Sequence, residues 1–452
     1  MNTTTNQKSN RIVPIIMMIA LFGMISFVTN LAAPMGQVLK EQFGVSNFQG
    51  LLGNMANFIA YAVMGIPGGI LLQRVGYKKT ALIAIAVGFI GVFIQFLSGH
   101  TPQAAAFAIY LLGAFVAGFS MCLLNIVVNP MLNTLGGGGN KGNQLIQVGG
   151  SFNSVMATFT PAFVGILIGE AAKANIKDVF PVLYIAMGVF ALVFFVMWAV
   201  RIPEPHATKT KEPLKNLMSG AMKFRHFILG AIGIFVYVGV EVGTAGILFL
   251  WLSDTPVGKT TAGFVAGTYW FLMLVGRLLG ASLGSKISSK AMLGTVSLVG
   301  IILILAAIFS PTTTQVALPV LQTSATGSLS FGMAQVPINA MFIVLVGLCT
   351  SIMWGSIFNL AVEGLGKYTP AASGIFMTLV CGGGILPAVQ GAVADSAGYL
   401  TSYWVIFIGL AYLLYYALIG SKNVNKNIST VDVEDVPVEI APQSLPTEEQ
   451  MK

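Results

Sequence analysis

The chain has 452 residues, of which 56% are hydrophobic and only 8% charged, and its mean hydropathy is +0.84. Soluble proteins carry about 25% charged residues, so this composition excludes a water-soluble protein and indicates a helical protein with many membrane spans. The formal net charge is +8, and its distribution between the two sides of a membrane matters more than its sum.

Twelve apolar stretches are long enough to cross a bilayer, which takes about 20 residues each. They form two sets of six, so the sequence predicts an all-α membrane protein with twelve transmembrane helices in two six-helix halves. The predicted spans are residues 12–35, 48–73, 80–98, 104–134, 144–169 and 179–200, then 227–252, 261–285, 291–309, 336–363, 371–394 and 401–420.

The segments outside the spans complete the predicted organisation. The region between the two sets is rich in Pro and Lys, which is typical of a solvated linker, and the end of the chain shows no apolar periodicity, which indicates disorder. The predicted segments are an N-terminus at 1–11, a first half at 12–200, a linker at 201–226, a second half at 227–420 and a tail at 421–452.

The positions of Lys and Arg predict the orientation of the chain. Placing the N-terminus in the cytoplasm puts 15 of these residues in cytoplasmic segments and 4 in outer loops, the tail excluded. Cytoplasmic loops of membrane proteins are enriched in Lys and Arg, so we expect both termini to be cytoplasmic. We also expect no cleaved signal peptide, a bacterial inner (plasma) membrane location, a monomer in the lipid bilayer and no nucleic-acid partner.

One carboxylate, Glu241, lies near the middle of the span 227–252. A charge at that depth costs roughly 3 kcal/mol on insertion scales, so such residues usually face a bundle interior or a water-filled cavity and serve a function. The alternative is an acid paired with a neighbouring polar group for structure alone.

The two halves resemble each other in sequence. An Asn precedes Leu-Gly by the same interval at Asn129–Gly136 and at Asn359–Gly366, near the ends of the fourth and tenth spans. A Pro-Ala pair also recurs at Pro161 and Pro387, in the fifth and eleventh spans. Recurrence in the same order indicates a duplicated six-helix unit, which is typical of transporters built from two halves.

The segment Gly69–Lys79 (GILLQRVGYKK) resembles the loop motif of the major facilitator superfamily, with Gln73 in place of the usual acid. More specifically, the chain resembles the fucose permease and glucose/galactose transporter family over residues 20 to 415. The matching segments are Phe43–Gln49, Ile66–Ile70, Asn129–Pro130, Phe152–Ser154, Tyr237–Gly239, Gly276–Arg277 and Gly382–Gly391.

This resemblance implies a secondary transporter that moves a monosaccharide by alternating access, often together with a cation. It also implies proton-handling acids in the first and fourth helices, but those positions fall at Ala33 and Asn125 here. A sugar-binding Asn of the family corresponds to Asn153, whereas its partner Gln corresponds to Gly150. The proton route of the fucose permease is therefore in question for this chain.

A sugar site needs amide and carboxylate groups for the hydroxyls and an aromatic face for the C–H surface. Each amide could instead join helices, the two Trp could be packing residues, and Asn129 and Asn359 could be architectural because they recur in both halves. Arg277 could pair with an acid or gate the inner mouth. The candidate substrate-binding residues are Asn30, Asn125, Asn129, Gln147, Asn153, Glu241, Trp270, Trp354, Asn359 and Gln390.

The sequence predicts an importer of a monosaccharide such as a hexose or fucose, either facilitative or coupled to H⁺ or Na⁺ through Glu241. The alternative is a transporter of another solute, such as a nucleoside or an organic anion, and an anion would depend strongly on Arg277. We find no phosphate-binding loop and no metal-binding His pattern, so we expect no enzyme, no metal centre and no cofactor besides a coupling ion.

Overall fold

The computed structural model describes residues 12–29, 47–168, 176–202, 204, 214–323 and 329–425. Among these residues, ten helices are long and apolar enough to cross a membrane. One of them, Ala56–Ser98, covers the predicted span 80–98 and most of the span 48–73, and the more polar helix α4 (Gly139–Ile168) covers nearly all of the predicted span 144–169.

The helices of the first half follow the predicted spans to within a few residues at most ends. They are an N-terminal helix (Ile12–Thr29), α2 (Asn47–Ser98), α3 (Gln103–Leu135), α4 (Gly139–Ile168), the short 3₁₀ turn η1 (Ile176–Val179) and α5 (Phe180–Ala199).

The linker contains one short helix, and the second half combines long helices with helices that are interrupted. The elements are α6 (Leu214–Ala221), α7 (Arg225–Ser253), α8 (Gly258–Leu283), α9 (Ser289–Phe309), β1 (Gln315–Thr323), β2 (Leu329–Pro337), α10 (Ile338–Thr350), α11 (Met353–Val362), η2 (Gly366–Tyr368), α12 (Thr369–Thr378), η3 (Leu379–Cys381), α13 (Gly382–Ala397), α14 (Tyr399–Tyr415) and η4 (Tyr416–Gly420).

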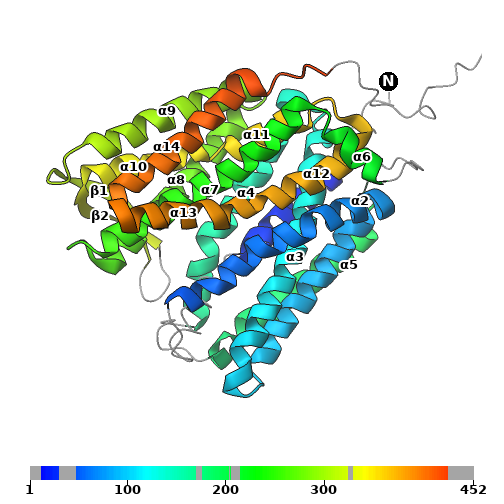
Figure 1. The fold of residues 1–452 in the computed structure, drawn as a ribbon. Coiled ribbons are helices and arrows are strands. Elements are labelled where there is room, and N and C mark those ends of the chain that lie inside the picture. The colour runs from blue at the N-terminus through cyan, green and yellow to red at the C-terminus, as the bar shows by residue number, and fades with distance from the viewer. Residues whose placement is uncertain are drawn as a thin grey trace, which may run out of the picture.

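The two halves converge at the end that carries α6 and diverge toward the opposite end (Figure 1). At the convergent end, which we call the linker end, α12 packs on α2 and α4 packs on α8. The approach of α12 to α2 is backbone to backbone, because a Cβ built on Gly374 would lie 2.7 Å from the Gly65 carbonyl oxygen. The halves are therefore in close contact at the linker end.

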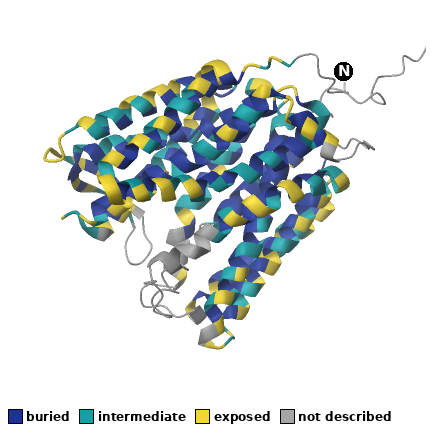
Figure 2. Cartoon of the chain, in the orientation of Figure 1, coloured by how far each residue is buried: buried dark blue, intermediate teal, exposed yellow. Residues whose placement is uncertain are grey.

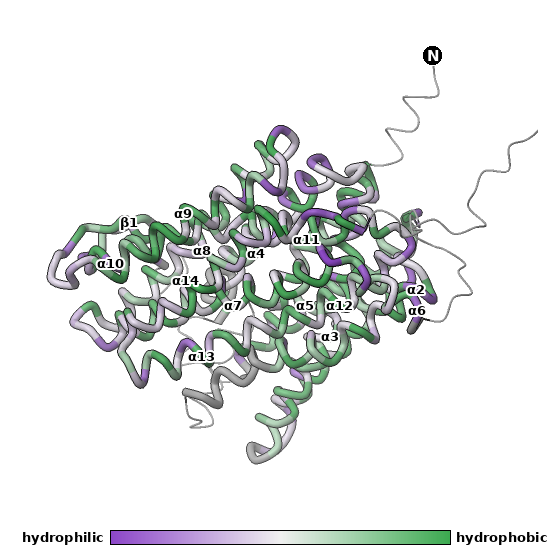
Figure 3. Tube along the Cα trace, turned by 45° about the horizontal axis from the view of Figure 1, so that its top comes forward, coloured by the Kyte–Doolittle hydropathy of each residue, from purple (hydrophilic) through white to green (hydrophobic). Residues whose placement is uncertain are grey.

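The outer surface of both halves is apolar. On α5, Leu192, Phe195 and Trp198 are each about two-thirds exposed, and exposed positions recur along all the outer helices (Figure 2). These helices are hydrophobic along most of their length, and hydrophilic residues gather mainly toward their ends (Figure 3), a pattern expected of helices that cross a membrane.

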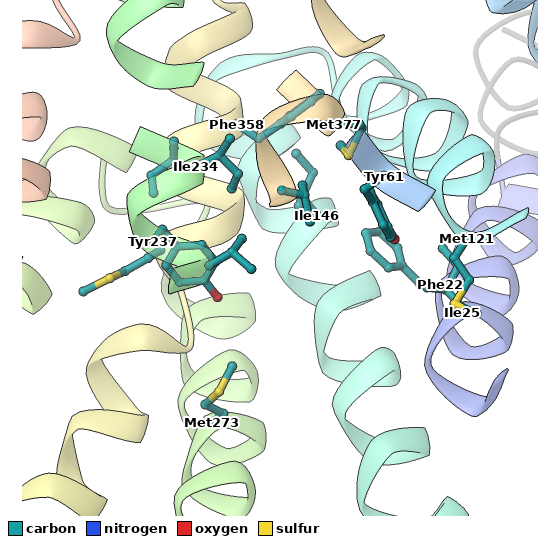
Figure 4. Packing of buried hydrophobic residues seen from close by; sticks show 14 of the residues in the cluster. Phe22, Ile25, Tyr61, Met121, Ile146, Ile234, Tyr237, Met273, Phe358 and Met377 are labelled. Carbon is teal, nitrogen blue, oxygen red and sulfur yellow. The ribbon is translucent and has the colours of Figure 1, made fainter. Parts of the chain in front are cut away.

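The buried apolar residues of the two halves meet in one continuous cluster (Figure 4). Tyr61 and Met121 come from the first half, Tyr237 and Phe358 come from the second, and Ile146 of α4 belongs to the same cluster. This contact positions the polar residues that cross between the halves.

Two spans predicted as continuous helices are interrupted. The stretch 336–363 breaks at Ser351 and Ile352 into α10 and α11, and the stretch 371–394 is divided by η3. A break frees backbone carbonyls, which is tolerated at membrane depth only where other groups satisfy them. Arg277 Nε donates to the Ser351 carbonyl at 3.2 Å, and Gln147 Nε2 donates to the Ile352 carbonyl at 2.9 Å.

Helix α2 also changes direction, at Gly76, whose φ of 83° lies in the left-handed region. The second part of α2 begins there with free N–H groups, and Glu204 from the linker accepts hydrogen bonds from Tyr77 N at 2.5 Å and Lys78 N at 2.9 Å. A carboxylate at a helix N-terminus satisfies these donors and complements the helix dipole.

We expect Glu204→Ala to lower the stability of the protein by about 1 kcal/mol, the usual effect of removing a helix cap. Glu204→Gln keeps an acceptor oxygen and should lose less. Thermal unfolding of the purified variants, followed by fluorescence, would measure both, and equal melting temperatures for Glu204→Ala and the wild type would contradict this role.

The hairpin formed by β1 and β2 was not predicted. Its strands pair antiparallel over nine residue pairs, from Gln315 with Pro337 to Thr323 with Leu329. The region between residues 309 and 336 has no predicted membrane span, and its nine-residue strands are too short to form one.

Candidate functional site

A chain of side-chain hydrogen bonds crosses from one half to the other near the middle of the molecule. Trp354 Nε1 on α11 donates to Asn129 Oδ1 on α3 at 2.9 Å. Asn129 Nδ2 donates to Asn125 Oδ1 at 3.2 Å, and Asn125 Nδ2 donates to the Tyr61 hydroxyl at 2.7 Å. Because Asn125 and Asn129 are four residues apart, they share one face of α3, and this face meets the second half.

Aromatic rings surround the Trp354 end of this chain. The Trp354 ring contacts Tyr237 and Phe376 edge-on, each with a centroid distance of 6.3 Å. The Tyr237 ring is fully buried, whereas Trp354 is half-buried. The indole therefore presents part of its surface beside the polar chain.

The second polar group of the site is the pair Glu241 and Arg277. Glu241 Oε1 on α7 lies 3.6 Å from Arg277 Nη2 on α8, and both side chains are only 13% exposed. A buried charge loses its favourable interactions with water, and an opposite charge nearby offsets part of that free-energy cost. The structure thus gives Glu241 the charged partner that the sequence left open.

Arg277 also contacts the other half of the protein. Its Nη1 donates to Ser154 Oγ at 2.6 Å, to the Gly150 carbonyl at 3.2 Å and to Asn153 Oδ1 at 3.4 Å, all on α4. The Nδ2 of Asn153 in turn donates to the Phe22 carbonyl of the N-terminal helix at 3.0 Å. One guanidinium therefore connects α7, α8 and α4.

Further contacts between the halves lie toward the linker end. Besides Gln147, whose amide meets the break between α10 and α11, Gln144 Nε2 donates to the Ala281 carbonyl at 3.0 Å. Asn359 accepts from Asn133 Nδ2 at 2.6 Å and donates to Ser289 Oγ at 2.8 Å. Asn359 is thus fully engaged in joining helices, as expected of an architectural residue.

Three of the predicted substrate-binding residues, Asn30, Trp270 and Gln390, are not part of the hydrogen-bonded groups described above. Asn30 lies outside the described residues. Trp270 is 40% exposed and lies two helical turns from Arg277 on the same face of α8. Gln390 is buried against Gly243, two positions from Glu241 and therefore near the opposite face of α7, and its amide has no partner among the described residues. The structure does not bring Gln390 to the pair.

Tyr61, Asn133 and Ser154 also belong to these hydrogen-bonded groups, although they were not among the predicted site residues. Asn133 follows Asn125 and Asn129 at the same spacing of four, so the helical period was a signal that could have found it. Tyr61 and Ser154 gave no such signal, because each meets its partner across a contact between different helices.

The groups at the site favour hydrogen bonding to a neutral ligand. The charges of Glu241 and Arg277 cancel, and the remaining polar groups are amides and hydroxyls. In the described part of the chain, no cluster of three or more His, Cys, Asp or Glu residues could hold a metal ion.

Two six-helix halves with a polar site between them define a membrane transporter of the two-half class. The Major Facilitator Superfamily model matches residues 15–386. The chain belongs to this superfamily and is an integral membrane protein, which confirms the predicted fold class; its fold and relatives are those of transporters rather than of enzymes.

Similar proteins of known name cover nearly the whole chain. A glucose/galactose transporter of Brucella abortus is 31% identical over 439 residues, which are 94% of this chain and 98% of the relative. The L-fucose-proton symporter of Escherichia coli is 22% identical and covers 87% of this chain and 89% of its own length. The crystal structure of the transporter FucP in the outward conformation matches 92% of this chain and all of its own, with a TM-score of 0.76 and 19% identity.

Proposed function

We propose that the protein imports a neutral monosaccharide across the bacterial inner membrane by alternating access, with both termini in the cytoplasm. The observation that carries the proposal is the site between the halves, where a charge-neutral Glu241–Arg277 pair lies among amides and a half-buried indole. The names of the relatives, glucose/galactose transporter and L-fucose-proton symporter, support a sugar as the substrate.

The contacts between the halves explain how a sugar would drive the transport step. In the arrangement described, Asn129 accepts from Trp354 and Arg277 donates to Ser154. A bound sugar offers hydroxyl donors and acceptors that can replace these bonds. Such a ligand shifts the balance between two arrangements only by binding one of them more tightly.

Glu241 is the proposed site of the coupling ion. Arg277 already compensates its charge, so H⁺ or Na⁺ at Glu241 would compete with the guanidinium. If α4 and α8 separate at the linker end, Arg277 loses its bonds to Gly150, Asn153 and Ser154 and is left with Glu241 as its charged partner. That change would favour release of the ion on the linker side.

We expect Glu241→Gln to abolish accumulation driven by an ion gradient while keeping sugar exchange at equal concentrations. The amide cannot take up a proton or match the charge of Na⁺, but it keeps a polar oxygen beside Arg277. Uptake by proteoliposomes under imposed H⁺ or Na⁺ gradients, with glucose, galactose and fucose, would measure both activities. Gradient-driven accumulation by this variant would remove Glu241 from the coupling role.

Uptake of glucose, galactose and fucose by proteoliposomes also tests whether the protein transports a sugar at all. Glu363→Gln offers a matched control variant, because Glu363 is exposed after α11 and its main-chain oxygen contacts His226, which lies 15 residues before Glu241 on α7. A thermal-shift screen with hexoses, pentoses, fucose, nucleosides and organic anions would identify the ligand class. Stabilisation by an anion but by no sugar would overturn the proposed substrate in favour of the organic-anion alternative.

A further inference from the structure

The β1–β2 hairpin has one face that is buried against the protein and a second face that is largely exposed. Its inner face consists of Leu318 and Val320 on β1 with Ala334 and Val336 on β2, and each of these residues is at most 7% exposed. The hairpin thus packs one apolar face on the protein, as most antiparallel sheets do. The opposite face of such a sheet is usually polar because it meets water.

The outer face of the hairpin, which we define as Ala317, Pro319, Leu321, Phe331 and Met333, is mainly apolar, with Gln335 opposite Ala317 as an exposed polar residue. Pro319 pairs with Met333 and Leu321 with Phe331, so these side chains stand side by side on the same face. Phe331 is 67% exposed and Met333 is 62% exposed. Clustered exposed apolar residues mark contact with a membrane or with another protein.

The sequence around the hairpin lacks charge altogether. Residues 310–337 contain no Asp, Glu, Lys, Arg or His, whereas a soluble segment of that length would carry about seven charged residues on average composition. Strands at the edge of a sheet that face water are commonly protected by charged side chains, particularly Lys. A connector in bulk water would be exposed to pairing with other chains, and this one has no charged residue to prevent it.

The hairpin lies alongside the membrane-spanning part of α8. The backbone N–H of Leu321 donates to Thr268 Oγ1 at 3.0 Å, and the Phe331 ring contacts Phe271 with a centroid distance of 5.5 Å. Thr268 is ten residues beyond Gly258, the first residue of α8, which corresponds to about 15 Å along the helix axis. The strands thus run back along the bundle and do not project away from it.

The same helix shows which side of the bundle the hairpin occupies. Thr268 and Arg277 are nine residues apart, or two and a half turns, so they lie on opposite faces of α8. Arg277 faces α4 of the other half. The hairpin therefore packs on the peripheral side of α8, away from the site between the halves, where the apolar outer surface of the bundle continues.

From these observations we propose that the outer face of the hairpin is a membrane-contacting surface, seated at the boundary between lipid headgroups and acyl chains. The face is uncharged and is continuous with the apolar periphery of a membrane-spanning bundle. It lies beside Thr268 and Phe271, at least ten residues beyond the first residue of α8. Water and headgroups at this boundary can satisfy the unpaired strand edges, which the hydrocarbon interior cannot. Lipid thus covers the part of this face that the described residues leave exposed.

Spin labels would test the proposal on the full chain in liposomes of phosphatidylethanolamine and phosphatidylglycerol. Phe331→Cys and Met333→Cys would be made after replacing Cys122, Cys349 and Cys381, the three free cysteines. Collisions with oxygen, which concentrates in lipid, are then compared with collisions with a water-soluble nickel chelate. Leu298→Cys on α9, 49% exposed, and Thr313→Cys, exposed just before β1, provide the lipid and water references.

We expect both hairpin labels to collide more often with oxygen than with the nickel chelate, at a ratio above that of the Thr313 reference but below that of Leu298, which lies at the middle of α9. Labels that resemble the Thr313 reference would place the face in water and overturn the proposal. Labels shielded from both reagents would show that protein covers the face, as a partner or a second copy, and would overturn it as well. Because no step depends on the substrate, these outcomes are independent of the proposed sugar transport.

Discussion

Arg277→Ala is expected to unfold more readily than any other single variant considered and to lose sugar uptake entirely. The substitution leaves Glu241, 13% exposed, without its ion-pair partner and removes every bond from this side chain to α4. Removing one partner of a buried pair costs about 3–5 kcal/mol, because the remaining charge is uncompensated. Thermal unfolding in detergent and uptake by proteoliposomes would measure the two losses.

The double variant Glu241→Gln/Arg277→Gln separates charge from packing. It removes both charges while keeping polar side chains of similar reach, so much of the lost stability should return, whereas ion-driven uptake should not. A single Arg277→Ala variant as stable as the wild type would show that water already compensates Glu241. A double variant no more stable than Arg277→Ala would show that the hydrogen bonds to α4, not the ion pair, account for the loss.

Gly374→Val should open the linker end of the protein. The Cβ would lie 2.7 Å from the Gly65 carbonyl oxygen and 2.9 Å from the Gly69 Cα, which are backbone atoms that cannot rotate away. Overpacking of this kind costs typically 1–3 kcal/mol, a shift of roughly 5- to 150-fold in an equilibrium. The arrangement with α2 and α12 apart should therefore gain population, and net transport should fall.

Spin labels at Arg74 and Lys286, both exposed near the linker end on different halves, would report this opening as a longer distance between the labels. Gly391→Val is the matched control, because a Cβ at Gly391 of α13 has no neighbour within 4 Å. The prediction fails if Gly374→Val and Gly391→Val give the same distance and the same uptake.

The fold was predictable from the sequence because lipid imposes a simple requirement on each span. About 20 consecutive apolar residues are needed whatever the neighbouring helices are, so α7 and α9 lie within two residues of the predicted limits. The break at Ser351 and Ile352 was not predictable in this way. The carbonyls at the break accept from Arg277 and Gln147, which are distant in sequence, so no local pattern marks the position.

The candidate site was predictable in its components but not in its connections. Glu241 was found because a charge in an apolar run is costly, and Asn129 and Trp354 because polar and aromatic groups are conspicuous there. That Trp354 donates to Asn129 across the two halves depends on tertiary packing, which no local pattern encodes. The hairpin was not predicted because each of its strands has nine residues, fewer than a membrane-spanning helix needs.

Several contacts between the halves end on backbone carbonyls, and this has an evolutionary consequence. Arg277 donates to Gly150, Gln147 to Ile352 and Gln144 to Ala281, in each case to the main-chain oxygen. Every amino acid supplies that oxygen, so these hydrogen bonds restrict the donor side chains but not the accepting ones. Deep mutational scanning should therefore find Gln144 less tolerant than Ala281, whereas Ile352 stays restricted by its own burial, and sequence covariation would fail to detect these hydrogen bonds although they join the two halves.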